Sequence, residues 1–145
     1  MNFPSRVLVD ADLFFSYLIT DNLISHSESV VLAAGRGELD LFVCSEIYDD
    51  LISALRSGGA SIDSVMSFLN SMNEIPHTPV SITVALAHDA LRLLNTYGGS
   101  RRLHYFDAFH VAASNIYHLP LLTSDKFVIA HRADFGIDII DLRTI

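Results

Sequence analysis

The sequence predicts an α/β fold: a three-layer α/β/α sandwich around a mostly parallel central sheet, formed by residues 1–145 as a single domain. Short apolar runs typical of buried strands alternate along the chain with segments of helical periodicity. Such alternation favours parallel strands joined by helices that cover both faces of the sheet. Half of the residues are hydrophobic and 18% are charged, so a chain of this length can bury a core. We find no internal repeat, low-complexity tract or linker.

The strands are predicted from short apolar runs that end in polar residues or turns. Glycines at positions 35 and 37 break the chain before the second run. The segment Ile75–Pro79 is expected to be extended, because a proline disfavours helix in the residue before it. The predicted strands are Arg6–Asp10, Leu41–Cys44, Leu121–Leu122 and Ile137–Leu142.

The helices are predicted where apolar residues recur with helical spacing. Ser45 is expected to cap the helix that follows the second strand, and glycines at 58 and 59 are expected to end it. The last predicted helix is apolar around most of its circumference, which indicates that it is buried. The predicted helices are Leu13–Ile19, Ser27–Ala34, the helix from Ser45 through Leu55, Ile62–Met72, Ser81–Tyr97 and Asp107–Tyr117.

The charge balance sets a condition on any function that involves nucleic acid. Nine basic residues stand against seventeen acidic ones, which gives a net charge of −8. Proteins that grip phosphates usually carry a basic surface, so this balance argues against a nucleic-acid partner unless several acids converge on a divalent cation.

Cysteine usage and hydropathy exclude other classes of protein. The single cysteine, Cys44, excludes an internal disulfide framework and a cysteine-rich zinc site. No apolar run reaches the length of a bilayer, and the first residues lack a signal-peptide pattern. We therefore expect a cytoplasmic protein.

Four acids from distant parts of the chain are predicted to meet at one edge of the sheet. Asp10 and Asp125 follow predicted strands, and Asp107 opens the buried helix, where the helix dipole favours a carboxylate. Asp50 lies early in the helix after Cys44. Sites in open parallel sheets form beyond the carboxyl ends of the strands, so these four acids are the predicted catalytic and metal-binding residues.

Asp50 is one of three acids in its helix. It lies closest to the apolar stripe of that helix, whereas Glu46 and Asp49 are expected to point further into solvent; Glu46 remains the alternative ligand. Clustered carboxylates repel one another unless a cation pairs with them, and oxygen ligands without Cys or His suit Mg²⁺ or Mn²⁺. Such ions, one or two of them, activate water for phosphodiester hydrolysis.

These acids lie in motifs that resemble those of PIN-domain ribonucleases, a family that includes the VapC-like toxins. Val7–Asp10 with Asp12 resembles the first motif, usually Asp-x-Asn or Asp-x-Ser, and Asp50-Leu51 stands in the place of a Glu-Leu second motif. The third and fourth motifs are matched by Tyr105–Ala113, with Asp107, and by Leu122–Phe127, with Asp125. The match spans nearly the whole chain.

The resemblance implies a PIN-like fold and a Mg²⁺- or Mn²⁺-dependent endoribonuclease. In this family the enzyme is often the toxin of a toxin–antitoxin pair and often a homodimer, so RNA, an antitoxin and a second copy are the expected partners. The sequence departs from the family pattern twice. Asp50 is one methylene shorter than the usual Glu, and Asp12 adds a charge beside Asp10.

Further residues are predicted to serve substrate binding. Thr123 and Ser124 are expected to position Asp125, although ordinary turn bonding explains them as well. Phosphate contacts are predicted for Arg101, Arg102 and His104, which precede Asp107, although a solvated basic loop accounts for these residues equally well. The seven histidines show no paired metal spacing and are interpreted as structural or surface residues. The predicted substrate-binding residues are Asp12, Thr123, Ser124, Arg101, Arg102 and Lys126.

Two other functions remain open on the sequence. In a phosphohydrolase of the haloacid-dehalogenase type, Asp10 would be the nucleophile and Asp12 the acid–base, but the chain is short for that fold with its cap. A PIN-like scaffold that binds RNA or protein without cutting is compatible with the acidic charge and with Asp50. Taken singly, each acid also has a local explanation as a turn former, an N-cap or a solvated helix residue.

Overall fold

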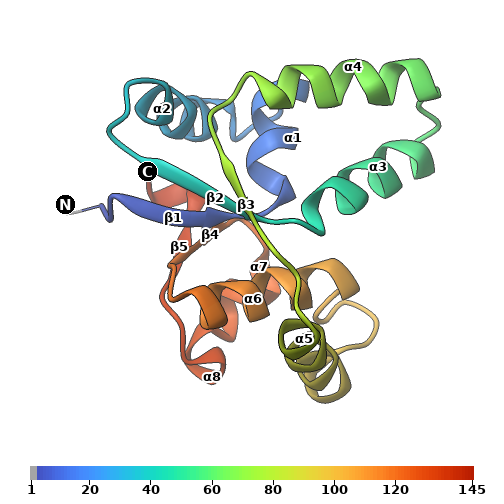
Figure 1. The fold of residues 1–145 in the computed structure, drawn as a ribbon, viewed down its shortest axis with the longest axis vertical. Helices are drawn as coiled ribbons and strands as arrows, with labels where there is room; N and C mark the ends of the chain where they lie inside the picture. Colours follow the sequence, from blue (N-terminus) through green and yellow to red (C-terminus); the bar gives the residue numbers. More distant parts are fainter. Residues whose placement is uncertain (1–2) are drawn as a thin grey trace.

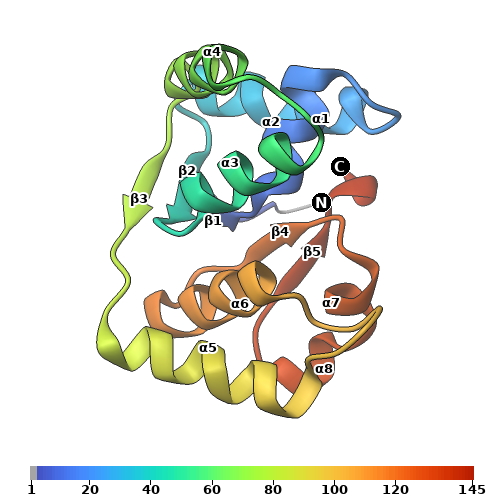
Figure 2. The same cartoon turned by 90° about the vertical axis from the view of Figure 1, so that its right-hand side faces the viewer.

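The computed structural model describes residues 3–145, and its centre is a parallel five-stranded sheet of order β3-β2-β1-β4-β5. Helices cover both faces of this sheet (Figures 1 and 2), which confirms the predicted three-layer α/β fold. No helix in the described part of the chain is long and apolar enough to cross a membrane. The strands are β1 (Arg6–Val9), β2 (Asp40–Cys44), β3 (Thr78–Val80), β4 (Leu121–Thr123) and β5 (Ile139–Asp141).

The helices divide into two layers according to the strands that they connect. The first layer precedes β3 and packs on one face of the sheet, and the second follows β3 and packs on the other (Figure 2). The first layer is α1 (Ala11–Ile19), α2 (Ile24–Gly35), α3 (Ile47–Ser57) and α4 (Ile62–Asn73). The second is α5 (Val84–Tyr97), α6 (Tyr105–Tyr117), α7 (Lys126–Ala130) and α8 (Arg132–Phe135); the chain closes on a 3₁₀ turn, η1 (Leu142–Thr144).

Alternation along the central strand divides the core into two halves. Val7 and Val9 of β1 pack into the apolar cluster under α1 to α4, whereas Leu8 packs into the cluster under α5 and α6. Successive side chains of a strand point to opposite faces, so a fully buried run such as this one serves both halves. The predicted buried helix is confirmed, since α6 is buried from Ala108 to Ser114.

The sheet has its topological switch point between β1 and β4. From β1 the chain moves outward to β2 and β3, and then crosses back through α5 and α6 to β4 on the other side of β1. Leu8 pairs with Leu121 and Val9 with Leu122, so the residues that follow β1 lie beside the end of β4. A crevice beyond the strand ends at such a point is where open α/β sheets bind ligands.

Two local predictions were wrong, and two short helices were missed. Ser45 does not cap α3: the capping position is Glu46, without a side-chain bond, and the Ser45 amide instead bonds Val80 O at 3.0 Å. Asp107 does not open α6 but is its third residue, after the N-cap His104. The short helices α7 and α8 were not predicted, because segments of five and four residues carry too little periodicity to detect.

Candidate metal centre

Asp10 and Thr123 meet across the switch point. Asp10 follows β1 and Thr123 ends β4, and the Thr123 hydroxyl donates a hydrogen bond to Asp10 Oδ2. The other carboxylate oxygen, Oδ1, accepts from the Asp12 amide at 3.1 Å and so caps α1. Asp10 is only 4% exposed. Its carboxyl group is therefore fixed in the sheet edge by contacts from two elements.

The turn between β4 and α7 brings two more acids to the same edge. The Ser124 hydroxyl donates to Asp12 Oδ2 at 2.7 Å. Asp125 caps α7, because its Oδ1 accepts from the Val128 amide at 2.8 Å, and its own amide donates to Thr123 Oγ1 at 3.0 Å. Thr123 thus orients both Asp10 and Asp125. Ser124 was predicted to position Asp125, but its hydroxyl orients Asp12 instead.

Asp107 joins the cluster from the first turn of α6. Its Oδ2 lies 3.6 Å from Nδ1 of His104, and one potential ligand atom each from His104, Asp107 and Asp125 lies within 4.8 Å of the others. This trio is the sole such group in residues 3–145, and it contains neither Asp10 nor Asp50. Of the four predicted carboxylates, the structure therefore places those of Asp107 and Asp125 close enough to share one ion.

Asp50 approaches from α3 and is held by a histidine of α6. His110 Nε2 lies 3.2 Å from Asp50 Oδ2, and the His110 side chain is only 2% exposed. Its other ring nitrogen, Nδ1, is buried without a hydrogen-bond partner in the part of the chain that the structure describes. No local sequence pattern predicts this contact, which joins residues 60 positions apart.

Burial and mutual repulsion raise the pKa values of the central acids. Burial is the main cause for Asp10, whose pKa lies well above its usual range, with further increases from Asp12 and Asp107. The pKa of Asp107 is raised to about 7 by burial, then by the charges of Asp125, Asp12 and Asp50, against a lowering by His110. The pKa of Asp12 is also raised, mainly by burial and further by Asp125. These carboxylates consequently lie close enough to destabilise one another.

The chain supplies little positive charge to offset this repulsion. Among residues 3–145 no lysine or arginine forms an ion pair with Asp10, Asp12, Asp50, Asp107 or Asp125, and the contacts to Asp50 and Asp107 come from histidines. Carboxylate oxygens that are poorly compensated and have raised pKa values fit a divalent cation. The donors differ from the sequence prediction in one respect: imidazole groups lie at the site, where only oxygen ligands were expected.

Glu46, the alternative to Asp50, is half-buried like Asp50, whereas Asp49 is exposed. Burial raises the pKa of Glu46, followed by the charges of Asp49 and Asp50, so Glu46 also lies near this edge. Solvent exposure therefore does not separate the two candidates. The contact with His110 favours Asp50 as the oriented ligand.

The predicted phosphate-binding cations lie on the surface around the acids. Arg101, Arg102 and Lys126 are exposed. The Arg102 guanidinium lies over the ring of Phe127, 5.8 Å from its centroid, which places this cation beside the α7 turn that carries Asp125. Thr123, in contrast, is buried with its hydroxyl engaged inside the site, which favours a positioning role over the substrate contact predicted for it.

Arg143, which lies outside the four motifs in the sequence, contacts the fourth motif. Its Nη2 donates to Ser124 O at 2.8 Å and its Nη1 to Asp141 Oδ1 at 3.0 Å. Asp141 ends β5, next to β4 in the sheet. The Arg143 guanidinium thus stabilises the turn that orients Asp12 and Asp125. The one signal for this role in the sequence is the position of Arg143 just after the last predicted strand.

Replacing Arg143 with alanine is expected to loosen this turn. The loss of two hydrogen bonds from a charged group should lower the free energy of unfolding by about 1–2 kcal/mol, because the side chain is partly exposed. Mn²⁺ affinity should fall as well, since Asp125 loses its fixed orientation. Thermal denaturation and calorimetric titration measure both effects. Arg132→Ala, an exposed arginine of α8, is the control; equal behaviour of the two variants would contradict the role of Arg143.

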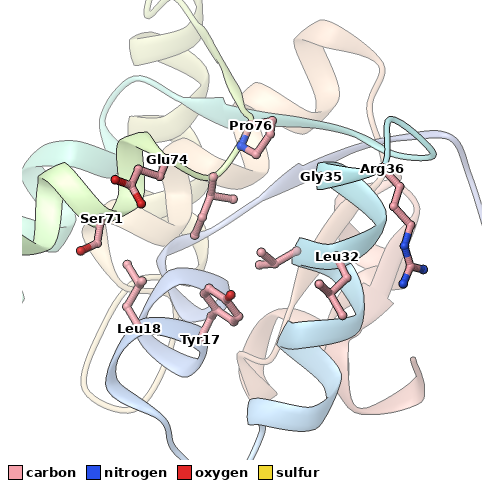
Figure 3. Close-up of a pocket in the computed structure, with 10 residues that line it drawn as sticks. Tyr17, Leu18, Leu32, Gly35, Arg36, Ser71, Glu74 and Pro76 are labelled. Atoms are coloured by element: carbon pink, nitrogen blue, oxygen red, sulfur yellow. The ribbon is translucent and has the colours of Figure 1, made fainter.

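A groove of about 540 Å³ lies elsewhere, between α1, α2 and the end of α4. Figure 3 shows Tyr17 and Leu18 on α1 and Leu32 on α2, with Glu74 just after the end of α4. None of the predicted site residues lines it. Its lining carries a single acid, Glu74, so the candidate site is the edge at which several carboxylates gather.

Comparison with known proteins identifies the fold. No family model and no curated protein matches the chain. Solved structures do: one of VapBC2 from Rickettsia felis bound to a promoter DNA fragment has a TM-score of 0.67 at 10% identity, over 94% of this chain and 98% of that one. VapBC-1 from nontypeable Haemophilus influenzae has a TM-score of 0.63 at 13% identity, over 95% and 98%.

A third structure, of VapBC-5 from Mycobacterium tuberculosis, has a TM-score of 0.59 at 17% identity, over 95% of this chain and 99% of that one. The all-parallel sheet and these likenesses show that the chain has the fold of these VapBC structures, the PIN-like fold that the motifs predicted. At such identities the likeness establishes the fold, and function has to be argued from the site.

Proposed function

We propose that this protein is a Mg²⁺- or Mn²⁺-dependent endoribonuclease that acts as the toxin of a toxin–antitoxin pair. The observation that carries the proposal is the group of poorly compensated carboxylates at the switch point of a VapC-like fold. A cytoplasmic location is part of the same proposal, because RNA is the proposed substrate. The likeness to VapBC toxin–antitoxin structures favours an antitoxin as partner, and a homodimer is proposed from the sequence resemblance.

The proposed metal ligands are Asp10, Asp50, Asp107 and Asp125. A divalent ion held by them would activate water and neutralise the charge that develops on the phosphodiester. Thr123, Ser124 and His110 hold three of the surrounding carboxylates, those of Asp10, Asp12 and Asp50, in fixed orientations. This arrangement leaves Oδ1 of Asp50 without a hydrogen-bond partner among residues 3–145.

The chain's own nucleophiles are poorly suited to a covalent route. Burial raises the pKa of Cys44 to about 11, so it carries almost no thiolate near neutral pH. Asp10, the nucleophile of the haloacid-dehalogenase alternative, is only 4% exposed, which leaves little room for a phosphorus centre to approach it. Both observations favour hydrolysis by water.

The acidic balance of the protein requires that RNA be held locally. Arg101, Arg102 and Lys126 are the proposed phosphate contacts, and Asp12 is proposed to line the substrate site beside them. With a net charge of −8 and so few cations, binding should depend weakly on salt, since the slope is about −0.7 per phosphate contact in single strands.

Cleavage of single-stranded RNA by the purified protein tests the proposal. We expect cleavage with Mg²⁺ or Mn²⁺, none after exhaustive EDTA treatment, and recovery when metal is restored. Asp10→Asn should be inactive in all conditions, whereas Asp138→Asn, which changes an exposed acid, should cut like the parent.

Other outcomes point to the alternatives. A scaffold would bind Mn²⁺ poorly and cut no RNA in any metal. A phosphoenzyme trapped by beryllium fluoride would indicate the phosphohydrolase. Cleavage that survives EDTA would contradict the metal requirement itself.

A further inference from the structure

His104 occupies a position from which it can share an ion with two of the site acids. It is the N-cap of α6, with an extended backbone (φ −81°, ψ 160°), and it stands one turn before Asp107. Residues three apart at a helix start lie on the same face, so the imidazole lies above the Asp107 carboxylate, with Nδ1 3.6 Å from Oδ2. Donor atoms that share one ion at about 2.1 Å lie about 3.0–3.4 Å apart.

The third donor, Asp125, comes from the turn between β4 and α7. The potential ligand atoms of the three residues all lie within 4.8 Å of one another. The His104 side chain is 68% exposed and can move by the small distance that coordination requires. The trio is therefore close to the spacing of a metal site before any ion is added.

Each member of the trio has a ligand atom to offer. Asp125 uses Oδ1 to cap α7, which leaves Oδ2 without a hydrogen bond in the described part of the chain. His104 caps α6 with its backbone alone and makes no side-chain hydrogen bond to residues 3–145. The other imidazole of the site, that of His110, already has Nε2 engaged with Asp50.

We propose that His104 is a metal ligand together with Asp107 and Asp125, and that this nitrogen–oxygen set selects Co²⁺ or Zn²⁺ over Mg²⁺. Imidazole suits the borderline transition ions, whereas Mg²⁺ prefers oxygen donors and gives up its water reluctantly. The inference rests on the proposed function for the presence of a metal, and it adds which ion the site takes.

A plain ion pair is the competing explanation of the same geometry. A protonated His104 would attract Asp107 without any metal, and an exposed pair of this kind contributes about 0–1 kcal/mol to stability. The two explanations differ in what happens to metal affinity when the imidazole is removed. If His104 is only an ion-pair partner, removing it leaves the ratio of Co²⁺ affinity to Mg²⁺ affinity unchanged. If His104 is a ligand, removing it changes this ratio.

Calorimetric titration with Co²⁺, Mn²⁺ and Mg²⁺ separates the two. We expect the parent protein to bind Co²⁺ at least about tenfold more tightly than Mg²⁺. Loss of a partner that merely orients a ligand costs roughly 10–100-fold in metal affinity, so His104→Gln should weaken Co²⁺ binding at least tenfold. Mg²⁺ affinity should change by less than about threefold. His88→Gln, which alters an exposed histidine of α5, should match the parent.

A second variant, His104→Asp, keeps the proposal testable if the glutamine variant folds poorly. Aspartate is a favoured N-cap residue and replaces the nitrogen donor with oxygen, so the selectivity should move toward Mg²⁺. If both variants keep the parent's Co²⁺ to Mg²⁺ ratio while the parent still cuts RNA, the ligand assignment is overturned and the proposed function stands. If the ratio collapses but no ion supports cleavage, the ligand assignment stands and the proposed function fails.

Discussion

Asp107→Asn is expected to abolish RNA cleavage and, at the same time, to stabilise the metal-free protein. The activity should fall because the variant loses a charged ligand at the centre of the site. Metal ions contribute several kcal/mol of charge stabilisation in such reactions, so a decrease of about 10³-fold or more is expected. Cleavage rates with saturating Mn²⁺ measure this effect.

The gain in stability follows from the pKa of Asp107. Burial and the neighbouring acids raise it from 3.8 to about 7 in the folded protein. A raised pKa gives a stability contribution that is present below pH 4 and is lost as the pH rises through 7. At pH 8 the ionised carboxylate thus costs the metal-free fold at most about 4 kcal/mol, and asparagine removes this cost.

Thermal denaturation at pH 8 in EDTA tests the second half of the prediction. Asp107→Asn should unfold at a higher temperature than the parent. Asp134→Asn, which changes an exposed acid of α8, should leave both the melting temperature and the activity unchanged. An Asp107→Asn protein that is less stable than the parent at pH 8 would show that this carboxylate is compensated in the absence of metal.

Metal and pH are expected to act on stability in opposite directions. The pKa values of Asp10, Asp12 and Asp107 are all raised in the folded state, so the metal-free protein should lose stability as the pH rises from 5 to 8. This pH range follows from Asp107, whose pKa is 3.8 in the unfolded chain and about 7 in the folded protein. Burial is the main physical cause for each of these groups.

Added Mn²⁺ should reverse this loss. At a concentration one hundred times its dissociation constant, a ligand stabilises the folded state by about 2.7 kcal/mol. For a chain of this size the gain corresponds to roughly 5–10 °C in melting temperature. We expect the gain to be larger at pH 8 than at pH 5, where protons compete for the carboxylates.

Melting curves between pH 5 and 8, with EDTA or with Mn²⁺, measure this linkage. The double variant Asp10→Asn with Asp107→Asn serves as the comparison, because it should show a flatter pH dependence and little response to metal. A parent protein whose melting temperature ignores both pH and Mn²⁺ would mean that the acids neither repel one another nor bind an ion.

The fold class and the edge at which the acids collect could be predicted from local sequence patterns. Buried strands such as Val7–Val9 leave short apolar runs, and the helices between them leave a different period, so both are readable locally. The rule that sites form beyond the carboxyl ends of parallel strands then placed Asp10 and Asp125 at one edge. The absence of a signal for α7 and α8 reflects their length, which is too short to show a period.

Tertiary structure alone decided the partners of these acids. The Thr123 hydroxyl reaches Asp10 across 113 positions of sequence, and Ser124 reaches Asp12 across 112. Both contacts depend on the order of β1 and β4 in the sheet and on their register. The bond from Arg143 to Ser124 depends likewise on β5 lying next to β4. Strand order and register arise from the packing of the whole chain, so no local pattern encodes them.

The contacts of the histidines arise from tertiary packing in the same way. His110 meets Asp50 because α6 crosses the sheet edge beside α3, and His104 meets Asp125 because α6 begins beside the turn after β4. Neither pair has the close spacing along one helix or strand that marks a metal motif in sequence. Side chains from separate elements form a site only when the sheet assembles, because packing and not the covalent chain sets the distances between them.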